Sequence, residues 1–216
     1  MKNIFYRLAT LLLLSTAINN AGASAADQLN TLLNAMSSIT ADFQQRIENE
    51  QGDILQESSG ELILNRPQQF LWRTLSPYEH LLVANDNVLW LHDLDLEQVT
   101  KQSLSEDIQQ TPALLLSGDI EQINNQFVIT YTTQENQQTF DLTPKHDSGI
   151  FTQLSLTFSN KLLSAMSFRD GFSQLTTIEF DNVILNPTIS SSTFTFVPPV
   201  GIDIINNDSG FQPSNK

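Results

Sequence analysis

"GELILNRPQQFLWRTL", residues 60–75, consists of two short runs rich in apolar side chains that are separated by Pro67. Alternation with a period of two is typical of β-strands that bury one face. In a regular strand, Leu62, Leu64 and Arg66 point to the same face. The first run therefore predicts a strand with an apolar face and an arginine at its end.

The second run places Phe70 and Trp72 on one face, so that Arg66 lies at the rim of an apolar surface. A buried guanidinium must use its N–H donors, because unpaired donors are costly. Backbone carbonyls at the end of a helix are unpaired and partially negative, and an arginine bonded to them would act as a reversible latch. The alternative is an ion pair with one of the 24 acidic residues.

Eight further segments carry the same strand signal, and tight-turn residues such as Asp170-Gly171 separate several of them. They are residues 39–47, 80–84, 88–92, 127–132, 139–143, 151–159, 162–169 and 172–183. Roughly ten short, mostly sequential strands predict an antiparallel meander. The pattern fits either a curved sheet or a barrel.

A helix is predicted at the start of this series, with Asp27 as its N-cap and its end near Ser37-Ser38. Its apolar residues fall at i, i+3, i+4 and i+7: Leu29, Leu32, Leu33 and Met36. The segment "TPALLLSGD", residues 111–119, predicts a second, short helix between Thr111 and Gly118. Because residues 113–116 are all apolar, this helix is either wedged in the core or a lid over the concave side of the sheet.

The first 25 residues have a basic start, an apolar run from Leu8 to Ile18 and a small-residue exit, which is typical of a secretory signal peptide. The run is too short for a spanning helix. We expect cleavage before Ala26 or Asp27, one domain over residues 26–205, and a disordered tail over residues 206–216.

The net charge of the chain is −14. Without the signal peptide, 8 basic residues remain against 24 acidic ones, a net charge of −16. Such a surface repels nucleic acid and anionic lipid head groups, which excludes nucleic-acid binding. The chain has no cysteine, so it can form no disulfide and carry no lipid anchor on a cysteine.

No motif in the sequence indicates catalysis, a cofactor or a metal. His80, His92 and His146 are scattered without metal-ligand spacing, and no nucleophile elbow or phosphate loop is present. His146-Asp147 is interpreted as a solvated loop rather than an acid–base pair. We therefore expect no enzyme activity.

The motif "DLDLE" would place Asp93, Asp95 and Glu97 on one strand face, where they could hold calcium. The spacing does not match an EF-hand loop. An exposed acidic edge that resists strand pairing is the favoured interpretation.

Apolar side chains are the distinctive feature, with 13 phenylalanines against two tryptophans and three tyrosines. They could simply form a core. A large curved sheet, however, encloses more volume than its own side chains fill, and can then hold a ligand.

"NRPQQFLW", "LWLHDLDLEQVT", "PALLLSG", "DLTPK" and "FTFVPPVGIDII" occur in this order between residues 65 and 205. Together they resemble the LolA family of periplasmic lipoprotein carriers of Gram-negative bacteria, and the likeness extends over residues 27–205. The resemblance implies an unclosed antiparallel β-barrel, mainly β with a few helices, with an α-helical lid over an apolar cavity. It also implies a soluble periplasmic chaperone, expected to be a monomer. Such a chaperone receives acylated lipoproteins from an inner-membrane ABC transporter and delivers them to an outer-membrane receptor.

The resemblance also implies roles for single residues. Arg66 matches the arginine that latches the lid, Phe70 matches an exposed phenylalanine important for transfer, and Trp72 matches the aromatic residue that follows. From the pattern we expect the cavity and lid to be lined by Leu33, Met36, Leu62, Leu64, Trp72, Trp90, Leu114 and Leu115. The alternatives to a carrier are a periplasmic domain that senses lipid or lipoprotein during envelope stress, and a hydrolase with an undetected site.

Overall fold

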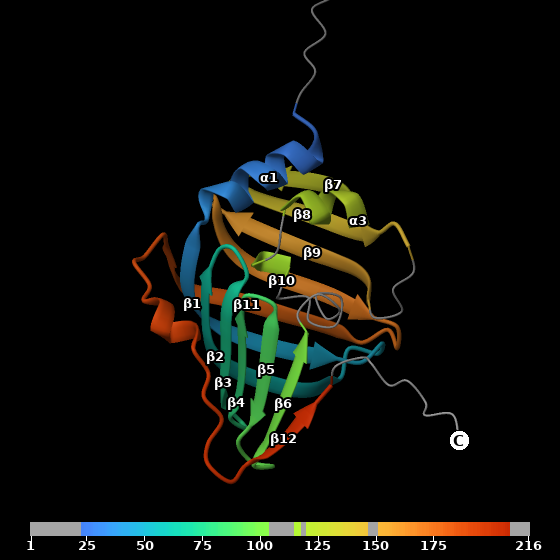
Figure 1. The fold of residues 1–216 in the computed structure, drawn as a ribbon. Helices are drawn as coiled ribbons and strands as arrows, with labels where there is room; N and C mark the ends of the chain where they lie inside the picture. The colour runs from blue at the N-terminus through green and yellow to red at the C-terminus, as the bar shows by residue number, and fades with distance from the viewer. Residues whose placement is uncertain (1–22, 104–114, 118–119, 147–150, 208–216) are drawn as a thin grey trace, which may run out of the picture.

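The computed structural model describes residues 23–103, 115–117, 120–146 and 151–207 (Figure 1). The helices with assigned bounds are α1 (Ala25–Ala35), α3 (Ile120–Gln126) and the 3₁₀ helix η2 (Ser191–Phe194). The strands are β1 (Ser38–Glu48), β2 (Ile54–Asn65), β3 (Gln69–Ser76), β4 (His80–Asn85), β5 (Val88–Asp93), β6 (Gln98–Ser103), β7 (Phe127–Gln134), β8 (Gln137–Pro144), β9 (Phe151–Ser159), β10 (Leu162–Asp170), β11 (Leu175–Leu185) and β12 (Asp203–Asn206).

The strands of the described residues form one 12-stranded sheet in the order β12-β6-β5-β4-β3-β2-β1-β11-β10-β9-β8-β7. Neighbouring strands are antiparallel except β12, which runs parallel to β6. The pairing of β1 with β11 joins the run β1–β6 to the run β7–β11. The two end strands, β12 and β7, do not pair with each other, so the sheet is curved but open (Figure 1).

This architecture confirms the predicted mainly β fold with an unclosed antiparallel sheet, and all ten predicted segments coincide with strands. Strands β6 and β12 and helix α3 were not predicted. The β6 sequence "QVTKQS" has Val99 as its one strongly apolar residue, and all four β12 residues are exposed. Without alternating burial, these segments carry no period-two signal.

Helix α1 begins one turn earlier than predicted. Ser24 is the N-cap: its side chain accepts from the Asp27 backbone N–H at 3.1 Å, and the Asp27 carboxylate accepts from the Ser24 N–H at 3.2 Å. Asp27 is therefore the third residue of a capping box rather than the cap itself. The predicted end is confirmed, since Met36 is the C-cap and β1 begins at Ser38.

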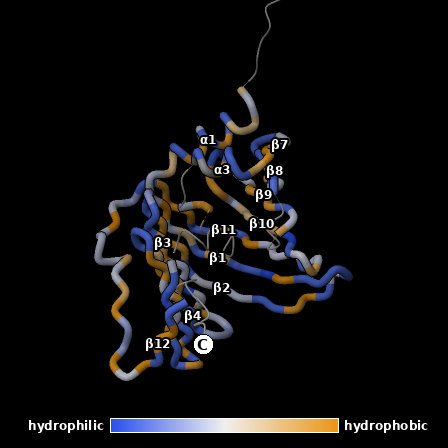
Figure 2. The backbone as a smooth tube through the Cα atoms, turned by 45° about the vertical axis from the view of Figure 1, so that its right-hand side comes forward, coloured by the Kyte–Doolittle hydropathy of each residue, from blue (hydrophilic) through white to orange (hydrophobic). Residues whose placement is uncertain are grey.

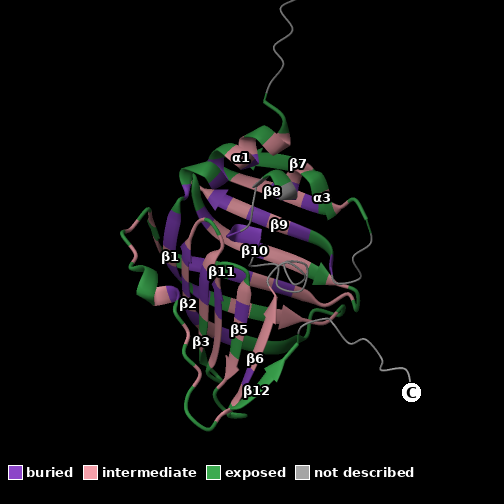
Figure 3. Ribbon diagram, viewed as in Figure 1, coloured by how far each residue is buried: buried purple, intermediate pink, exposed green. Residues whose placement is uncertain are grey.

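The larger hydrophobic core lies on the face of the sheet that α1 covers, here called the inner face. Apolar and polar residues alternate along the strands (Figure 2), and the buried positions concentrate along the middle of the sheet (Figure 3). Its fully buried large side chains include Leu29 and Leu33 of α1 and, on the strands, Ile39, Phe43, Leu62, Leu64, Phe70, Leu89, Phe140 and Phe158. The interior is therefore continuous from β5 to β9.

A second, smaller core lies on the opposite face, here called the outer face. Leu71 of β3, Val83 of β4 and Phe194 of η2 form its buried centre. The segment that contains η2 packs against β3 and β4, so the C-terminal part of the chain covers this side of the sheet.

The sheet bends at Gly60 in β2. The register of β2 against β3 shifts between Ser59 and Gly60, which marks a bulge. A Cβ atom at Gly60 would clash with the Arg73 carbonyl oxygen and would lie 2.8 Å from the ring of Phe43. Glycine therefore permits β3 and Phe43 to approach β2 closely enough to curve the sheet.

Candidate functional site

The turn between β2 and β3 connects two segments that lie against the inner face. The Arg66 backbone N–H donates to the Ser37 carbonyl at 2.8 Å, directly after α1. The Gln68 N–H donates to the Ser117 carbonyl at 3.2 Å. Gln68 has a positive φ of 59°, which turns the backbone toward residue 117. The predicted latch residue thus belongs to a turn that holds both the α1 exit and the 115–117 segment.

The Arg66 guanidinium is shielded from water, and this desolvation lowers its pKa to about 10. Because that pKa lies well above neutrality, the side chain is protonated at neutral pH. The burial of a charge disfavours the closed arrangement, while bonds to the guanidinium favour it, so that the two effects offset each other. A contact of this kind is specific in geometry and modest in net strength.

Two of the predicted cavity residues and the predicted transfer residue lie together in the inner-face core. Leu62 and Leu64 of β2 are buried in the inner-face core, and Phe70 of β3 pairs with Leu64 across the two strands. The expectation that Phe70 is exposed is wrong, because its exposed fraction is 0 %. The same alternation that aligns Phe70 with Trp72 directs it to the buried face.

Trp72 is the centre of an aromatic cluster built from three strands. Its ring stacks on Phe43 of β1 at 3.8 Å between centroids, lies 6.2 Å from the ring of Phe70, and meets the edge of Phe180 of β11 at 6.4 Å. Trp72 remains partly exposed, whereas Phe43, Phe70 and Phe180 are buried. The cluster thus connects the buried interior to solvent through the partly exposed ring of Trp72.

The lid residues Leu33 and Met36 are buried against the inner face, and so is Leu115. Leu114 and most of the predicted second helix, residues 111–114 and 118–119, lie outside the described residues. Leu116, which was not predicted as a lining residue, is also buried in this core.

Trp90 does not line the inner face, and that prediction is wrong. Its ring lies 5.5 Å from Phe196 on the outer face, and Lys101 Nζ lies 5.4 Å from the ring centroid. Leu89, the preceding residue, occupies the inner face and is fully buried. In "VLWLH" both parities are apolar, so alternation alone does not decide which side chain points inward.

Sequence reasoning missed most of the lining supplied by the second half of the chain. These inner-face residues are Phe127, Phe140, Leu142, Leu154, Leu156, Phe158, Leu163, Met166, Ile178 and Phe180. The period-two alternation in "FTQLSLTFS" and "TFDLT" was sufficient to identify several of them. Their position opposite α1 depends on the pairing of β1 with β11, which no local pattern specifies.

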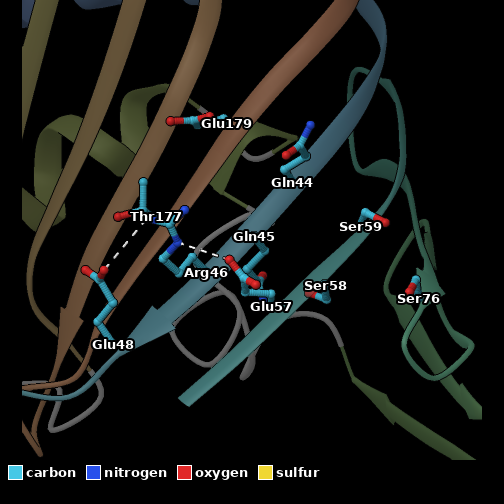
Figure 4. A pocket seen from close by; sticks show the side chains of 10 residues that line it. All are labelled: Gln44, Gln45, Arg46, Glu48, Glu57, Ser58, Ser59, Ser76, Thr177 and Glu179. Carbon is cyan, nitrogen blue, oxygen red and sulfur yellow. Dashed lines mark hydrogen bonds and ion pairs between the residues drawn. The ribbon is translucent and has the colours of Figure 1, made fainter. Parts of the chain in front are cut away.

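The outer face carries a polar hollow of about 440 Å³ over β2, β1 and β11 (Figure 4). Arg46 lies at its centre, 3.4 Å from Glu57 and 3.9 Å from Glu48. These groups are substantially exposed, so the ion pairs add little stability. All of its lining residues are polar or charged, which does not suit an acyl chain.

The remaining polar candidates do not form a reactive site. Asp93 is the last residue of β5, and residues 94–97 form the turn to β6, so the three carboxylates do not share one strand face. The Leu96 N–H donates to Asp93 at 3.0 Å, and His80 Nδ1 lies 3.5 Å from the same carboxylate. His146 is exposed, and Asp147 lies outside the described residues. Among the residues that the structure describes, no three His, Cys, Asp or Glu side chains are placed to hold a metal ion.

None of the helices in the described part of the chain combines the length and apolar character needed to cross a membrane. The inner face, the lid segments and the Arg66 turn together define a lidded, half-open β-barrel with an apolar interior.

The comparisons identify the family. The chain matches the outer membrane lipoprotein carrier protein LolA family over residues 34–197. It is 43% identical over 195 residues to an outer-membrane lipoprotein carrier protein from Pseudomonas paraeruginosa, covering 90% of this chain and 94% of that one. A carrier of the same name from Hahella chejuensis is 38% identical over 201 residues, covering 92% and 96%. The chain belongs to the LolA family.

A solved structure supports the fold. An uncharacterised conserved protein from Thermus thermophilus aligns with a TM-score of 0.51 at 9% identity, covering 83% of this chain and 99% of that one. At this identity the likeness concerns the fold alone.

Proposed function

We propose that this protein is a lipoprotein chaperone that shields the acyl chains of outer-membrane lipoproteins on its inner face. The family match and relatives at about 40% identity support a carrier function. The structural observation that carries the proposal is the continuous apolar interior beneath α1 and residues 115–116. The family is one of carriers, and no enzymatic role is proposed.

The energetics suit a passive carrier. Moving a sixteen-carbon acyl chain from an apolar environment into water costs about 0.8 kcal/mol of free energy per CH₂, or roughly 12 kcal/mol in all. A lipoprotein with two or three chains therefore needs a shield to cross an aqueous compartment. No passive carrier can extract it from a bilayer unaided, so an energy-driven transporter must load the protein.

We expect α1 and the acyl chains of the cargo to compete for the same inner-face surface. In the closed structure the inner face is filled by its own side chains and by Leu29, Leu32, Leu33 and Met36 of α1. Burial of four such side chains is worth roughly 6–12 kcal/mol, comparable with one acyl chain. Acyl chains that displace α1 take over its apolar contacts with the inner face. The free energy of loading is therefore partly offset by the α1 contacts that are lost, which keeps both loading and release reversible.

The roles expected for single residues from the sequence are consistent with this loading and release of acyl chains. Arg66 acts as the latch that favours the closed lid, and Leu62, Leu64 and Trp72 receive the acyl chains. Phe70, which is buried in the closed structure, becomes available for partner contact only after the lid opens. An inner-membrane ABC transporter supplies the cargo in the periplasm, and an outer-membrane receptor removes it.

The test is to add the purified chain, residues 26–216, to spheroplasts that synthesise labelled outer-membrane lipoproteins. Release of labelled lipoprotein into the soluble fraction as a one-to-one complex is the expected result. A known carrier serves as the positive control. If that control releases lipoprotein and this chain does not, the carrier function is excluded.

A further inference from the structure

Within the described residues, the sheet ends in a strand that has one unpaired edge. Strand β7, "FVITYTTQ", is the last in the strand order and pairs only with β8 among the described residues. Exposed edge strands are normally blunted by lysine, proline, a bulge or short length, because a free edge attracts other chains. β7 has eight residues, no charge, no proline and no register shift. The other end of the sheet is β12, a parallel strand of only four residues.

The hydrogen-bond register identifies which groups point outward. Lys145 N–H donates to the Gln126 carbonyl at 2.8 Å, and β7 and β8 are joined by a two-residue turn after Gln134. In an antiparallel pair, bonded and non-bonded residues alternate. The even-numbered residues of β7 therefore bond to β8, and the N–H and C=O groups of Ile129, Tyr131 and Thr133 point away from it.

This edge is adjacent to the lid. Helices α1 and α3 both pack against β7, and the three elements lie together at one end of the molecule (Figure 1). Phe127 of β7 stacks on Phe151, and Tyr131 stacks on Phe140, so the inner side of β7 is continuous with the apolar interior. The outer-side residue Val128 is 54 % exposed, and Tyr131 itself is 38 % exposed.

We propose that the edge of β7 binds the extended polypeptide that follows the lipid-bearing residue of the cargo, by adding it to the sheet as a further strand. The inference rests on the proposed function. A cargo whose acyl chains lie under α1 must direct its polypeptide out of the interior, and the β7 edge lies beside that lid. Backbone pairing reads no side-chain sequence, which suits a carrier that accepts many different lipoproteins.

A second copy of the same chain is the competing occupant of such an edge. The net charge of −14 opposes it, because two-fold pairing of β7 strands would place two strongly acidic molecules side by side. The uncharged edge itself presents no such barrier to a neutral, extended peptide.

The experiment compares two probes: a diacylated cysteine amide, and the same diacylated cysteine followed by eight uncharged residues. The outward N–H and C=O groups of Ile129, Tyr131 and Thr133 can form up to six backbone hydrogen bonds. Because ordering the peptide offsets most of their free energy, we expect about tenfold tighter binding of the longer probe. Amide hydrogen exchange at Ile129, Tyr131 and Thr133 should slow when the longer probe binds and remain unchanged with the shorter one.

Two edge variants should abolish the difference between the probes. Thr133→Pro removes one outward N–H and leaves the bonds to β8 intact. Thr130→Lys/Thr132→Lys places charges on the edge while every backbone donor remains. The matched control Thr143→Lys/Gln153→Lys adds the same charge at exposed positions of the interior strands β8 and β9, and should retain the tenfold difference.

The outcomes separate the two proposals. Equal affinity of the wild-type chain for both probes, without slowed exchange, overturns the edge inference and leaves the carrier function intact. Failure to bind either probe overturns the carrier function and the inference with it. Slowed exchange at β7 that rises with protein concentration in the absence of any probe identifies a second copy as the occupant, which also overturns the inference.

Discussion

At the level of single residues, Arg66 is the residue that we propose as the latch of the lid. Its pKa of about 10, lowered by desolvation, means that the folded chain releases this proton before the unfolded chain does. The burial penalty is therefore complete below about pH 10 and diminishes as the pH rises from there toward the higher pKa of the unfolded chain. Between about pH 5 and 8 the Arg66 contribution is constant, so pH does not control the latch.

Substituting Arg66→Leu should separate cargo binding from cargo release. Leucine removes both the desolvation penalty and the charged latch, and it adds apolar contact for acyl chains. We expect acyl-probe affinity within about threefold of the wild type, and transfer to a purified receptor slowed about tenfold or more, as for loss of one charged hydrogen bond.

Arg73→Leu is the matched control, since Arg73 lies in the same hairpin, is exposed and pairs weakly with Glu61 at 4.0 Å. Its transfer rate should be unchanged. Transfer by Arg66→Leu at the wild-type rate would exclude the latch.

The two tryptophans should behave differently because they lie on opposite faces. Trp72→Ala removes the stack on Phe43, and Trp90→Ala removes the contact with Phe196. Both changes should lower the free energy of unfolding, by about 3 kcal/mol for Trp72. Only Trp72→Ala should weaken acyl-probe binding, by about tenfold, as measured by probe fluorescence. Equal weakening in both variants would contradict the assignment of faces.

At the level of elements, the β2–β3 hairpin combines curvature, lid contact and apolar lining. Gly60 bends the sheet, the turn at Arg66 and Gln68 bonds to Ser37 and Ser117, and β3 carries Trp72 into the interior. On the hairpin, these features all lie between residues 60 and 72. A local change in the bend is therefore expected to affect the site as well as stability.

Gly60→Ala should destabilise the chain by about 3 kcal/mol, because the new Cβ forces the Arg73 backbone and the Phe43 ring to move. Urea unfolding measures the change. Ser59→Ala, at the neighbouring partly exposed position, should remain within about 0.5 kcal/mol of the wild type. A neutral effect of Gly60→Ala would show that the close approach of β3 is not required.

At the level of the whole molecule, the two cores have different tasks. The outer-face core joins η2 to β3 and β4 and is closed by the chain's own C-terminal segment. The inner-face core is closed partly by α1, which gives way to acyl chains in the proposed function. Local opening of α1 should therefore require less free energy than global unfolding.

Leu33→Ala and Leu71→Ala test this division. Each should cost about 3 kcal/mol of stability, because each removes a buried leucine from one core. Only Leu33→Ala should raise the binding of an apolar fluorescent dye well below the unfolding temperature, since it weakens the lid over the larger interior. Similar dye binding by both variants would argue against a separately opening lid.

The alternation in residues 60–75 and in the other strand segments determined the mainly β class, and the α1 stripe determined one lid helix, because periodicity follows directly from burial on one face. The resemblance carried by five short motifs was specific enough to predict the family. The tertiary structure decided what local patterns leave open: that β1 pairs with β11, that Phe70 is buried, and that Trp90 faces outward. These depend on strand order and on which parity faces the interior, and both are settled by contacts between residues far apart in the chain.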